Sequence, residues 1–353
     1  MTGRSGVLGP GTRVIRHGGL SVRVYRPAVL LGVLLSALAG LAALFSLTVG
    51  DFTMGLGEVV GALTGRAGLM MTHVVVEMRL PRALTALGVG AALALSGALL
   101  QRLARNPLVS PDIIGVSAGA TTAAVFAIVA LGGTASTIAI SALVGAVGTA
   151  LALYSLVYRR GVDGYRLVLV GIALTAMLSA MTSYLLTRTE LTTAQRAMLW
   201  LTGSLANRDW PHVVTIASAL AVLMPIAFLL ARPLALLQLG EDTATALGGR
   251  VRLWRTVLLF TSAALAAMAT AVAGPIAFVA LVAPQIVRRL LRERAAGLVA
   301  SAACGGSLVA GADLIARTAF GGSEIPVGVV TGILGAPYLL YLLVRGNRAG
   351  RGG

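Results

Sequence analysis

The sequence contains no lysine, because all 28 of its basic residues are arginine. The loop that binds nucleotide phosphates in P-loop ATPases requires a lysine that reaches the β- and γ-phosphates. The chain therefore cannot carry an ordinary P-loop. Any energy from ATP must come from a partner polypeptide.

Cysteine and histidine are also scarce, with one and three residues respectively. Cys304 lies in an apolar stretch, which argues against a disulfide framework and a thiolate metal site. Residues 115–119 match the G-x-S-x-G pattern of serine hydrolases, but a base for Ser117 is missing. The histidines lie instead in the N-terminal tail, in an outer loop and at a span end: His17, His73 and His212. We expect no catalytic residue and no metal ligand, and we interpret the glycines around Ser117 as helix-packing residues.

Charged residues make up only 11% of the chain, against 57% hydrophobic residues. The basic residues lie between apolar blocks of about 20 residues, so the net charge of +16 does not indicate nucleic-acid binding. The sequence predicts an all-α integral membrane protein of about ten transmembrane helices. The spans are expected near 27–48, 81–104, 112–131, 134–158, 166–187, 211–231, 251–273, 275–291, 296–318 and 325–345, with a short extra helix at 191–204.

Two span boundaries depend on helix-breaking residues. Gly132-Gly133 separates the third and fourth spans, and Gly274-Pro275 separates the seventh and eighth. With this topology 21 of the 28 arginines lie on one side. The positive-inside rule then places both termini in the cytoplasm. The chain is thus divided into a basic N-terminal tail without a cleaved signal, a ten-span domain and a C-terminal tail, at 1–26, 27–345 and 346–353.

Glycine is abundant, at 44 residues, and recurs within spans at small-xxx-small spacing. Examples are the pairs Gly115 with Gly119 and Gly328 with Gly332. This spacing lets helix backbones approach closely, so we expect a tight bundle.

The cytoplasmic segment 233–249 predicts two short helices joined by a turn. Pro233 suits the start of the first helix, and Gly240 breaks it. Glu241 and Asp242 suit the N-terminus of the second helix, and Gly248-Gly249 ends it. Such a partly apolar knob fits a groove on a soluble partner. A simple surface linker is the alternative interpretation.

Three arginines lie near the predicted outer face. Arg79 and Arg82 flank Pro81 at the entrance of the second span, and Asp313 and Arg317 are one turn apart near the outer end of the ninth. Asp313 can pair with Arg317 along the helix. Alternatively, exposed arginines dock carboxylates of an acidic outer partner. The residues alone leave both interpretations open.

Taken together, these segments resemble the FecCD family of permeases, which serve ATP-binding-cassette importers of ferric siderophores, haem and vitamin B12. The matching segments run in family order: R-L-P-R at 79–82, Ser96 to Ala120, L-G-E-D-T-A-T-A-L-G at 239–248, G-P-I-A-F-V-A-L-V-A-P-Q-I-V-R-R at 274–289, A-D-L-I-A-R at 312–317 and P-V-G-V-V-T-G-I-L-G-A-P at 326–337. Within the family, the sequence of these segments is most similar to the G-type subunit of ferric-enterobactin permeases.

The resemblance implies a non-catalytic, multi-pass subunit of the cytoplasmic (inner) membrane, surrounded by lipid, that translocates a ferric siderophore of the catecholate type. Implied partners are a second permease chain, either a D-type homologue or a copy of this one, two ATPase subunits that hold ATP and Mg²⁺, and an extracytoplasmic siderophore-binding protein. No cofactor on this chain and no nucleic acid are implied. The alternatives are haem or vitamin B12 import, or an ion-coupled secondary transporter, which would need buried mid-span carboxylates.

The resemblance also assigns residues. It places the ATPase-coupling surface on Leu239, Gly240, Glu241, Asp242, Thr243, Ala244, Leu247 and Gly248, and docking of the binding protein on Arg79, Arg82 and Arg317. Two positions depart from the family. Gln285 stands where the family usually has histidine, which puts an imidazole-specific hydrogen bond in doubt. Asp163-Gly164 stands where the vitamin B12 permease has a Thr-Ser gate, so the inner gate is unassigned.

Overall fold

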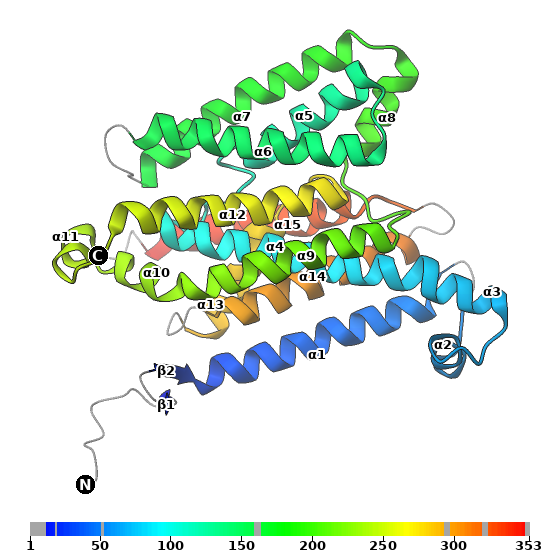
Figure 1. Cartoon of the computed structure of the whole chain (residues 1–353), viewed down its shortest axis with the longest axis horizontal. Coiled ribbons are helices and arrows are strands. Elements are labelled where there is room, and N and C mark those ends of the chain that lie inside the picture. Colours follow the sequence, from blue (N-terminus) through cyan, green and yellow to red (C-terminus); the bar gives the residue numbers. More distant parts are fainter. Residues whose placement is uncertain are drawn as a thin grey trace.

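The computed structural model describes residues 12–17, 20–50, 53–158, 164–292, 297–319 and 324–349. In these ranges the chain is a bundle of long helices that run side by side (Figure 1). The long elements are α1 (Arg26–Thr48), α4 (Leu80–Leu103), α5 (Val116–Leu131), α6 (Ala135–Tyr158), α7 (Gly164–Thr187), α9 (Trp210–Leu229), α12 (Val251–Ala273), α13 (Val279–Leu290), α14 (Leu298–Thr318) and α15 (Val327–Ala349). The short elements are α2 (Leu56–Leu63), α3 (Leu69–Thr72), the π-helix η1 (His73–Arg79), α8 (Leu191–Leu201), α10 (Ala231–Gln238), α11 (Glu241–Ala246) and the strands β1 (Thr12–His17) and β2 (Leu20–Tyr25).

Helix length and composition match the predicted spans. Among the described residues, seven helical stretches are long and apolar enough to cross a membrane: α1, the continuous stretch from α3 through α4, α6, α7, α9, α12 and α14. The shorter apolar helices α5 and α15 and the 12-residue α13 account for the other three predicted spans. At 1.5 Å per residue α13 rises only about 18 Å, which is less than the hydrocarbon thickness of a bilayer. The predicted span at 275–291 is therefore only partly helical, since residues 274–278 precede α13 without helical structure.

Both predicted breaks are present. α5 is followed by Gly132 at φ 59°, and α12 is followed by Gly274 at φ 74°. Both values lie in the left-handed region, which glycine adopts without a steric penalty. The breakers therefore end these helices where the sequence predicted.

The turn at Gly132 gives a simple test of this role. A Cβ at Gly132 would meet no atom within 4 Å. The cost of a side chain at this position therefore comes from the left-handed backbone conformation alone. We expect Gly132→Ala to lower the free energy of unfolding by about 1 kcal/mol, measured by thermal unfolding in detergent. Gly148 also has open space at its Cβ position, but it lies within α6. Gly148→Ala should be neutral or stabilising, and equal losses from both variants would contradict this account.

α4 is the central helix of the bundle and packs against α9, α12, α13 and α14. Two glycines permit its closest approaches. A Cβ at Gly90 would lie 2.2 Å from the carbonyl oxygen of Gly305 in α14, and one at Gly97 would lie 1.7 Å from that of Ala280 in α13. The backbones meet directly because no side chain separates them.

The glycines named from their spacing behave differently from one another. A Cβ at Gly119 would lie 1.9 Å from Thr149 Oγ1, and one at Gly328 would lie 2.1 Å from the carbonyl oxygen of Thr202. A Cβ at Gly332 would meet nothing within 4 Å. The predicted close packing is thus confirmed for Gly119 and Gly328, whereas Gly332 has no such contact among the described residues.

The helices form three groups in Figure 1. α5, α6, α7 and α8 lie together at the top, α4, α9 and α12–α15 fill the centre, and α1 lies at the bottom. α12 joins the first two groups through contacts with α5 and α6, and α1 packs on α14. One end of the bundle carries the start of α1, α10 and α11, and is called the α11 end here. The other carries α2, α3 and α8, and is called the α2 end (Figure 1).

Two elements differ from expectation. In the N-terminal tail, β1 and β2 pair as an antiparallel hairpin in which Thr12 pairs with Tyr25 and His17 with Leu20. Its strands contain several β-branched residues, which favour extended backbone. At the α2 end, the loop before the second span contains α2 and α3, and η1 continues directly into α4. Neither the hairpin nor these helices was predicted.

Candidate functional site

The predicted knob at the α11 end is confirmed as a helix–turn–helix. α10 and α11 are joined through Gly240, whose φ of 116° requires glycine. Leu234, Leu237 and Ala244 are buried and hold the two helices against the bundle. Gly248, at φ 79°, reverses the chain before α12. The knob is therefore a packed structure and not a loose linker.

The knob presents both apolar and acidic groups at its surface. Leu239 and Leu247 are 62% and 61% exposed. Asp242 and Thr243 are exposed in the first turn of α11, whereas Glu241 forms an ion pair with Arg255 of α12. Two exposed leucines beside a carboxylate suit insertion into a groove on another protein.

A hydrogen bond connects the knob to the turn that follows α4. Arg105, in the left-handed turn that follows α4, donates from Nη2 to the carbonyl oxygen of Leu237 in α10. A polar cavity of about 270 Å³ lies beside this contact and is lined by Gln101, Arg102, Arg105, Pro107, Gln238 and Arg288. The hydrogen bond thus joins α10 to the turn that follows α4.

Gln285, which stands where the resembled family usually has histidine, is part of a buried amide pair. Its Nε2 donates to Oε1 of Gln101 at 2.8 Å and to the carbonyl oxygen of Pro107 at 2.9 Å. Gln101 in turn donates to the carbonyl oxygen of Leu281 at 3.0 Å. These bonds join α4, the following turn and α13. Gln285 therefore makes amide hydrogen bonds at this position, a partnership that sequence reasoning missed.

This amide pair predicts a measurable contribution to stability. Gln285→Leu would deprive two buried acceptors of their donor, and each such loss costs about 1–3 kcal/mol. We expect the free energy of unfolding to fall by about 3 kcal/mol, measured by thermal unfolding of the purified chain. Gln238→Leu, at an exposed position of α10, is the matched control and should change stability little. Equal effects would show that the buried hydrogen bonds are not the cause.

The three arginines predicted to dock a partner meet at the α2 end, where the chain itself engages them. Arg82 donates from Nε to both oxygens of Asp313, at 3.1 and 3.2 Å, and from Nη2 to Oδ1 at 2.9 Å. Its Nη1 donates to both oxygens of Glu324 at 3.0 Å. Only 13% of the Arg82 side chain is exposed. Sequence spacing did not indicate either carboxylate partner of Arg82.

Arg79 and Arg317 are also enclosed. Arg79 is buried and donates from Nη1 to the carbonyl oxygen of Leu47 at 2.7 Å. Arg317 Nε lies 3.3 Å from Oδ2 of Asp313, and its terminal nitrogens donate to the end of α1 at Ser46 and Val49. The predicted helical pair of Asp313 with Arg317 is confirmed. The arginines thus hold α1, α4 and α14 together, and their predicted docking role is not tested by these contacts.

One further arginine lies at this end. Arg208, in the turn before α9, is within electrostatic range of Arg82. Its Nε is buried without a hydrogen-bond partner, and the described part of the chain shows no ion pair for it. The adjacent Asp209 forms an ion pair with His212 and also lies within electrostatic range of Arg208. Sequence reasoning did not single out Arg208.

The serine of the G-x-S-x-G segment is hydrogen bonded to a nearby carboxylate. Ser117, near the start of α5, donates its hydroxyl to Oδ1 of Asp112 at 2.6 Å. Gly115 precedes the helix at φ 88°. His212 lies in the first turn of α9, at the opposite end of the bundle. Ser117 therefore has no histidine base among its described partners.

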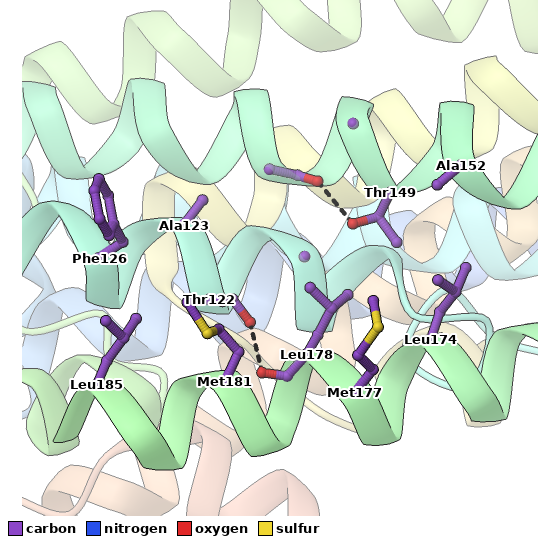
Figure 2. Close-up of a pocket in the computed structure, with 13 residues that line it drawn as sticks. Thr122, Ala123, Phe126, Thr149, Ala152, Leu174, Met177, Leu178, Met181 and Leu185 are labelled. Atoms are coloured by element: carbon purple, nitrogen blue, oxygen red, sulfur yellow. Dashed lines mark hydrogen bonds between the residues drawn. The ribbon is translucent and has the colours of Figure 1, made fainter. Parts of the chain in front are cut away.

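A lateral pocket of about 390 Å³ lies between α5, α6 and α7 (Figure 2). Its lining is apolar apart from Thr122 and Thr149, and neither hydroxyl is left unpaired. Thr122 hydrogen bonds to Thr182 at 2.9 Å, and Thr149 donates to the carbonyl oxygen of Gly145 at 2.9 Å (Figure 2). No lining residue is ionisable, so the pocket suits hydrocarbon rather than a charged ligand.

Two remaining expectations concern metal ligands and the gate. Within the described residues, no group of three His, Cys, Asp or Glu side chains is placed to hold a metal ion. Of the Asp163-Gly164 pair, Asp163 lies outside the described residues, and Gly164 begins α7. The inner gate therefore stays unassigned.

A bundle of long apolar helices with a structured helix–turn–helix at one end defines a multi-pass membrane protein. The FecCD transport family matches residues 34–345, and the chain belongs to this family. It is a multi-pass permease subunit of an ATP-binding-cassette importer, and the ATPase is a separate chain.

Individual relatives agree with this assignment. The chain is 42% identical to the ferric enterobactin transport system permease protein FepG of Escherichia coli, over 93% of this chain and 99% of the relative. It is 41% identical to the achromobactin transport system permease protein CbrC of Dickeya dadantii, over 85% and 87% of the two chains. Identity to the vitamin B12 import system permease protein BtuC of Klebsiella pneumoniae is 37%, over 78% and 83%.

A solved structure shares the fold. It is a metal-chelate type ABC transporter in an inward-facing conformation, with a TM-score of 0.81 and 29% identity. The match covers 90% of this chain and 99% of the solved one. The expected fold class is thereby confirmed.

Proposed function

We propose that this chain carries a ferric siderophore of the catecholate type across the cytoplasmic membrane. The observation that supports the substrate is the 42% identity to a ferric enterobactin permease over nearly the whole of both chains. A second relative, 41% identical, is named for achromobactin transport. In this proposal the chain is a conduit, and an extracytoplasmic binding protein supplies most of the substrate selectivity.

The proposed assembly has two permease chains around a central path, the second being a D-type homologue or a copy of this chain. Two ATPase subunits bind ATP and Mg²⁺ and dock at the knob. When ATP closes the ATPases, α10 and α11 move, and the bundle alternates between outward and inward access. The contact of Arg105 with Leu237 and the amide pair of Gln101 with Gln285 are the bonds in the chain that connect this movement to α4 and α13.

The α11 end faces the cytoplasm in this proposal, together with both termini, as the arginine distribution predicts. Cysteine labelling tests the orientation, since the native Cys304 is buried. Thr245 of α11 and Glu190 before α8 are both exposed and lie at opposite ends. In intact cells a membrane-impermeant maleimide should label Glu190→Cys and spare Thr245→Cys. The reverse pattern would contradict the orientation.

Uptake into proteoliposomes tests the substrate. The chain would be co-expressed with its permease, ATPase and binding-protein partners, and reconstituted with ATP inside. We expect uptake of ⁵⁵Fe-labelled catecholate siderophore that requires ATP and persists with a proton uncoupler. Uptake of haem or cobalamin alone would support those alternatives. Uptake that collapses with the uncoupler but survives ATP depletion would support a secondary transporter.

A further inference from the structure

The polar cavity at the α11 end collects positive charge from separate parts of the chain. Its volume is about 270 Å³, and its lining consists of three arginines, two glutamines and one proline: Gln101, Arg102, Arg105, Pro107, Gln238 and Arg288. None of these described residues is acidic or aromatic. The wall therefore carries positive charge without a carboxylate of its own, and it creates a potential that attracts anions.

The three arginines are held in place by two packed helices. Arg102 lies in the last turn of α4 and Arg288 in the last turn of α13. Arg105 lies in the turn after α4 at φ 51°, a left-handed conformation that arginine rarely adopts. α4 and α13 are joined beneath the cavity by the hydrogen bond of Gln285 to Gln101. The spacing of the three guanidinium groups is thus set by the fold.

The cavity is accessible from solvent. Arg105, Pro107 and Gln238 are exposed, whereas Gln101 is the buried member of the lining, at 1% exposed. The carboxamide of Gln101 is fixed by its bonds to Leu281 and Gln285. A small ion can therefore reach the arginines without any helix having to move.

Arg105 also keeps donors available for a ligand. A guanidinium group carries five N–H donors. In the described part of the chain, Arg105 uses its Nη2 for one hydrogen bond, to the carbonyl oxygen of Leu237. Gln238, the last residue of α10, adds a carboxamide at the rim of the same cavity. The lining thus combines charge with hydrogen-bond donors.

This combination favours a phosphate group over other anions. A phosphate presents oxygens in several directions, and guanidinium forks bind such oxygens in pairs. A carboxylate has two oxygens in one plane, which a single guanidinium satisfies. A whole nucleotide does not fit, because pockets for larger ligands have volumes of about 300–1,000 Å³. The wall also has no aromatic ring on which a base could stack.

We propose that the cavity binds a phosphate group, held by the guanidinium groups of Arg102, Arg105 and Arg288. Two sources supply this chemistry, namely the headgroup of an anionic phospholipid and free phosphate. In the orientation proposed above the cavity lies on the cytoplasmic side, where basic pockets between helices bind anionic headgroups. Because Gln238 ends α10, a bound phosphate would brace the knob against α4 and α13.

Isothermal titration calorimetry of the full chain in an uncharged detergent tests the site, with inorganic phosphate as the probe and constant ionic strength. The chain is used without its ATPase partners, because they have phosphate sites of their own. Gln238→Glu puts a carboxylate into the lining, and Arg288→Gln removes a cation from it. Hydrogen bonds to charged groups are strong, so each variant should weaken phosphate binding by about tenfold or more. Arg250→Gln, at an exposed position of the same end outside the lining, is the matched control and should bind like the wild type.

Native mass spectrometry distinguishes the two sources of phosphate. If the source is a lipid headgroup, the wild-type chain should retain phosphatidylglycerol in preference to phosphatidylcholine, and Gln238→Glu should lose this preference. Phosphatidylglycerol should then also block the binding of inorganic phosphate. If the source is free phosphate, inorganic phosphate should bind equally well with and without phosphatidylglycerol, and lipid retention should not differ between the wild type and Gln238→Glu.

The remaining outcomes would overturn the site. One is a wild-type chain that binds no inorganic phosphate and whose lipid retention is unchanged by both cavity variants. The other is an equal loss of binding in Arg250→Gln, which would indicate attraction to the basic surface as a whole. Each variant would first be shown to unfold at the wild-type temperature without phosphate, and Gln238→Glu, at an exposed position, keeps the test open if Arg288→Gln does not fold. Siderophore uptake is measured separately, so failure of this site leaves the proposed function intact.

Discussion

Asp242→Arg should abolish ATP-driven uptake while the transporter still hydrolyses ATP. Asp242 is exposed in the first turn of α11 and has no hydrogen bond or ion pair in the described part of the chain. The substitution adds a long cation to the surface that is proposed to enter the ATPase groove. It also puts positive charge at the positive end of a helix. A mismatched charge in an interface costs several kcal/mol, so we expect uptake to fall more than about tenfold.

Paired assays in proteoliposomes measure this effect as the ratio of siderophore imported to ATP hydrolysed. Glu190→Arg, at the opposite end of the bundle, is the matched control and should keep the wild-type ratio. Transport by Asp242→Arg with a normal ratio would contradict the coupling assignment of the knob.

Glu241 is less suitable for this test. Its ion pair with Arg255 attaches α11 to α12. Charge reversal at Glu241 is also expected to uncouple transport, but partly by loosening the knob from the bundle. Glu241→Gln, which removes the charge and keeps the shape, would separate the loss of attachment from a lost contact with the ATPase.

Asp313→Ala should cause the largest loss of stability. The side chain is buried between Arg82 and Arg317, and its removal leaves two largely enclosed guanidinium groups without their shared carboxylate. Breaking a buried ion pair from one side costs about 3–5 kcal/mol. We expect Asp313→Ala to purify poorly and to unfold at a clearly lower temperature in detergent.

Two comparisons show whether the buried charge is the cause. Glu324→Ala removes the exposed carboxylate from the same arginine and should cost no more than about 1 kcal/mol. Replacing Arg82 and Asp313 together by leucine should recover part of the stability lost in Asp313→Ala, because fewer unpaired charges then remain. If Asp313→Ala were as stable as Glu324→Ala, the buried cluster would not hold α4 to α14.

The features that the sequence predicted correctly are local ones. Apolar length predicted the spans, the left-handed glycines ended α5 and α12, and Gly240 separated the two helices of the knob. Each depends on a few neighbouring residues and on the bilayer, which restricts the chain to helices. The pairing of Asp313 with Arg317 is also local, since it spans one helical turn.

The features that were missed depend on distant contacts. Arg82 is 231 residues from Asp313 and 242 from Glu324, so their pairing needs the packing of α4 against α14. The bonds of Gln285 to Gln101 and Pro107 likewise need the contact of α13 with α4. The exposure of the predicted docking arginines could not be read from composition, because a charged residue at a span end is either solvated or paired within the fold.

The amide pair of Gln101 and Gln285 makes the contact between α4 and α13 independent of pH near neutrality. Imidazole changes its charge and its donors between pH 5 and 8, whereas a carboxamide has no group that titrates in that range. The link between α4 and α13 therefore keeps the same hydrogen bonds between pH 5 and 8. A histidine at position 285 would instead make this contact between the two helices sensitive to protonation.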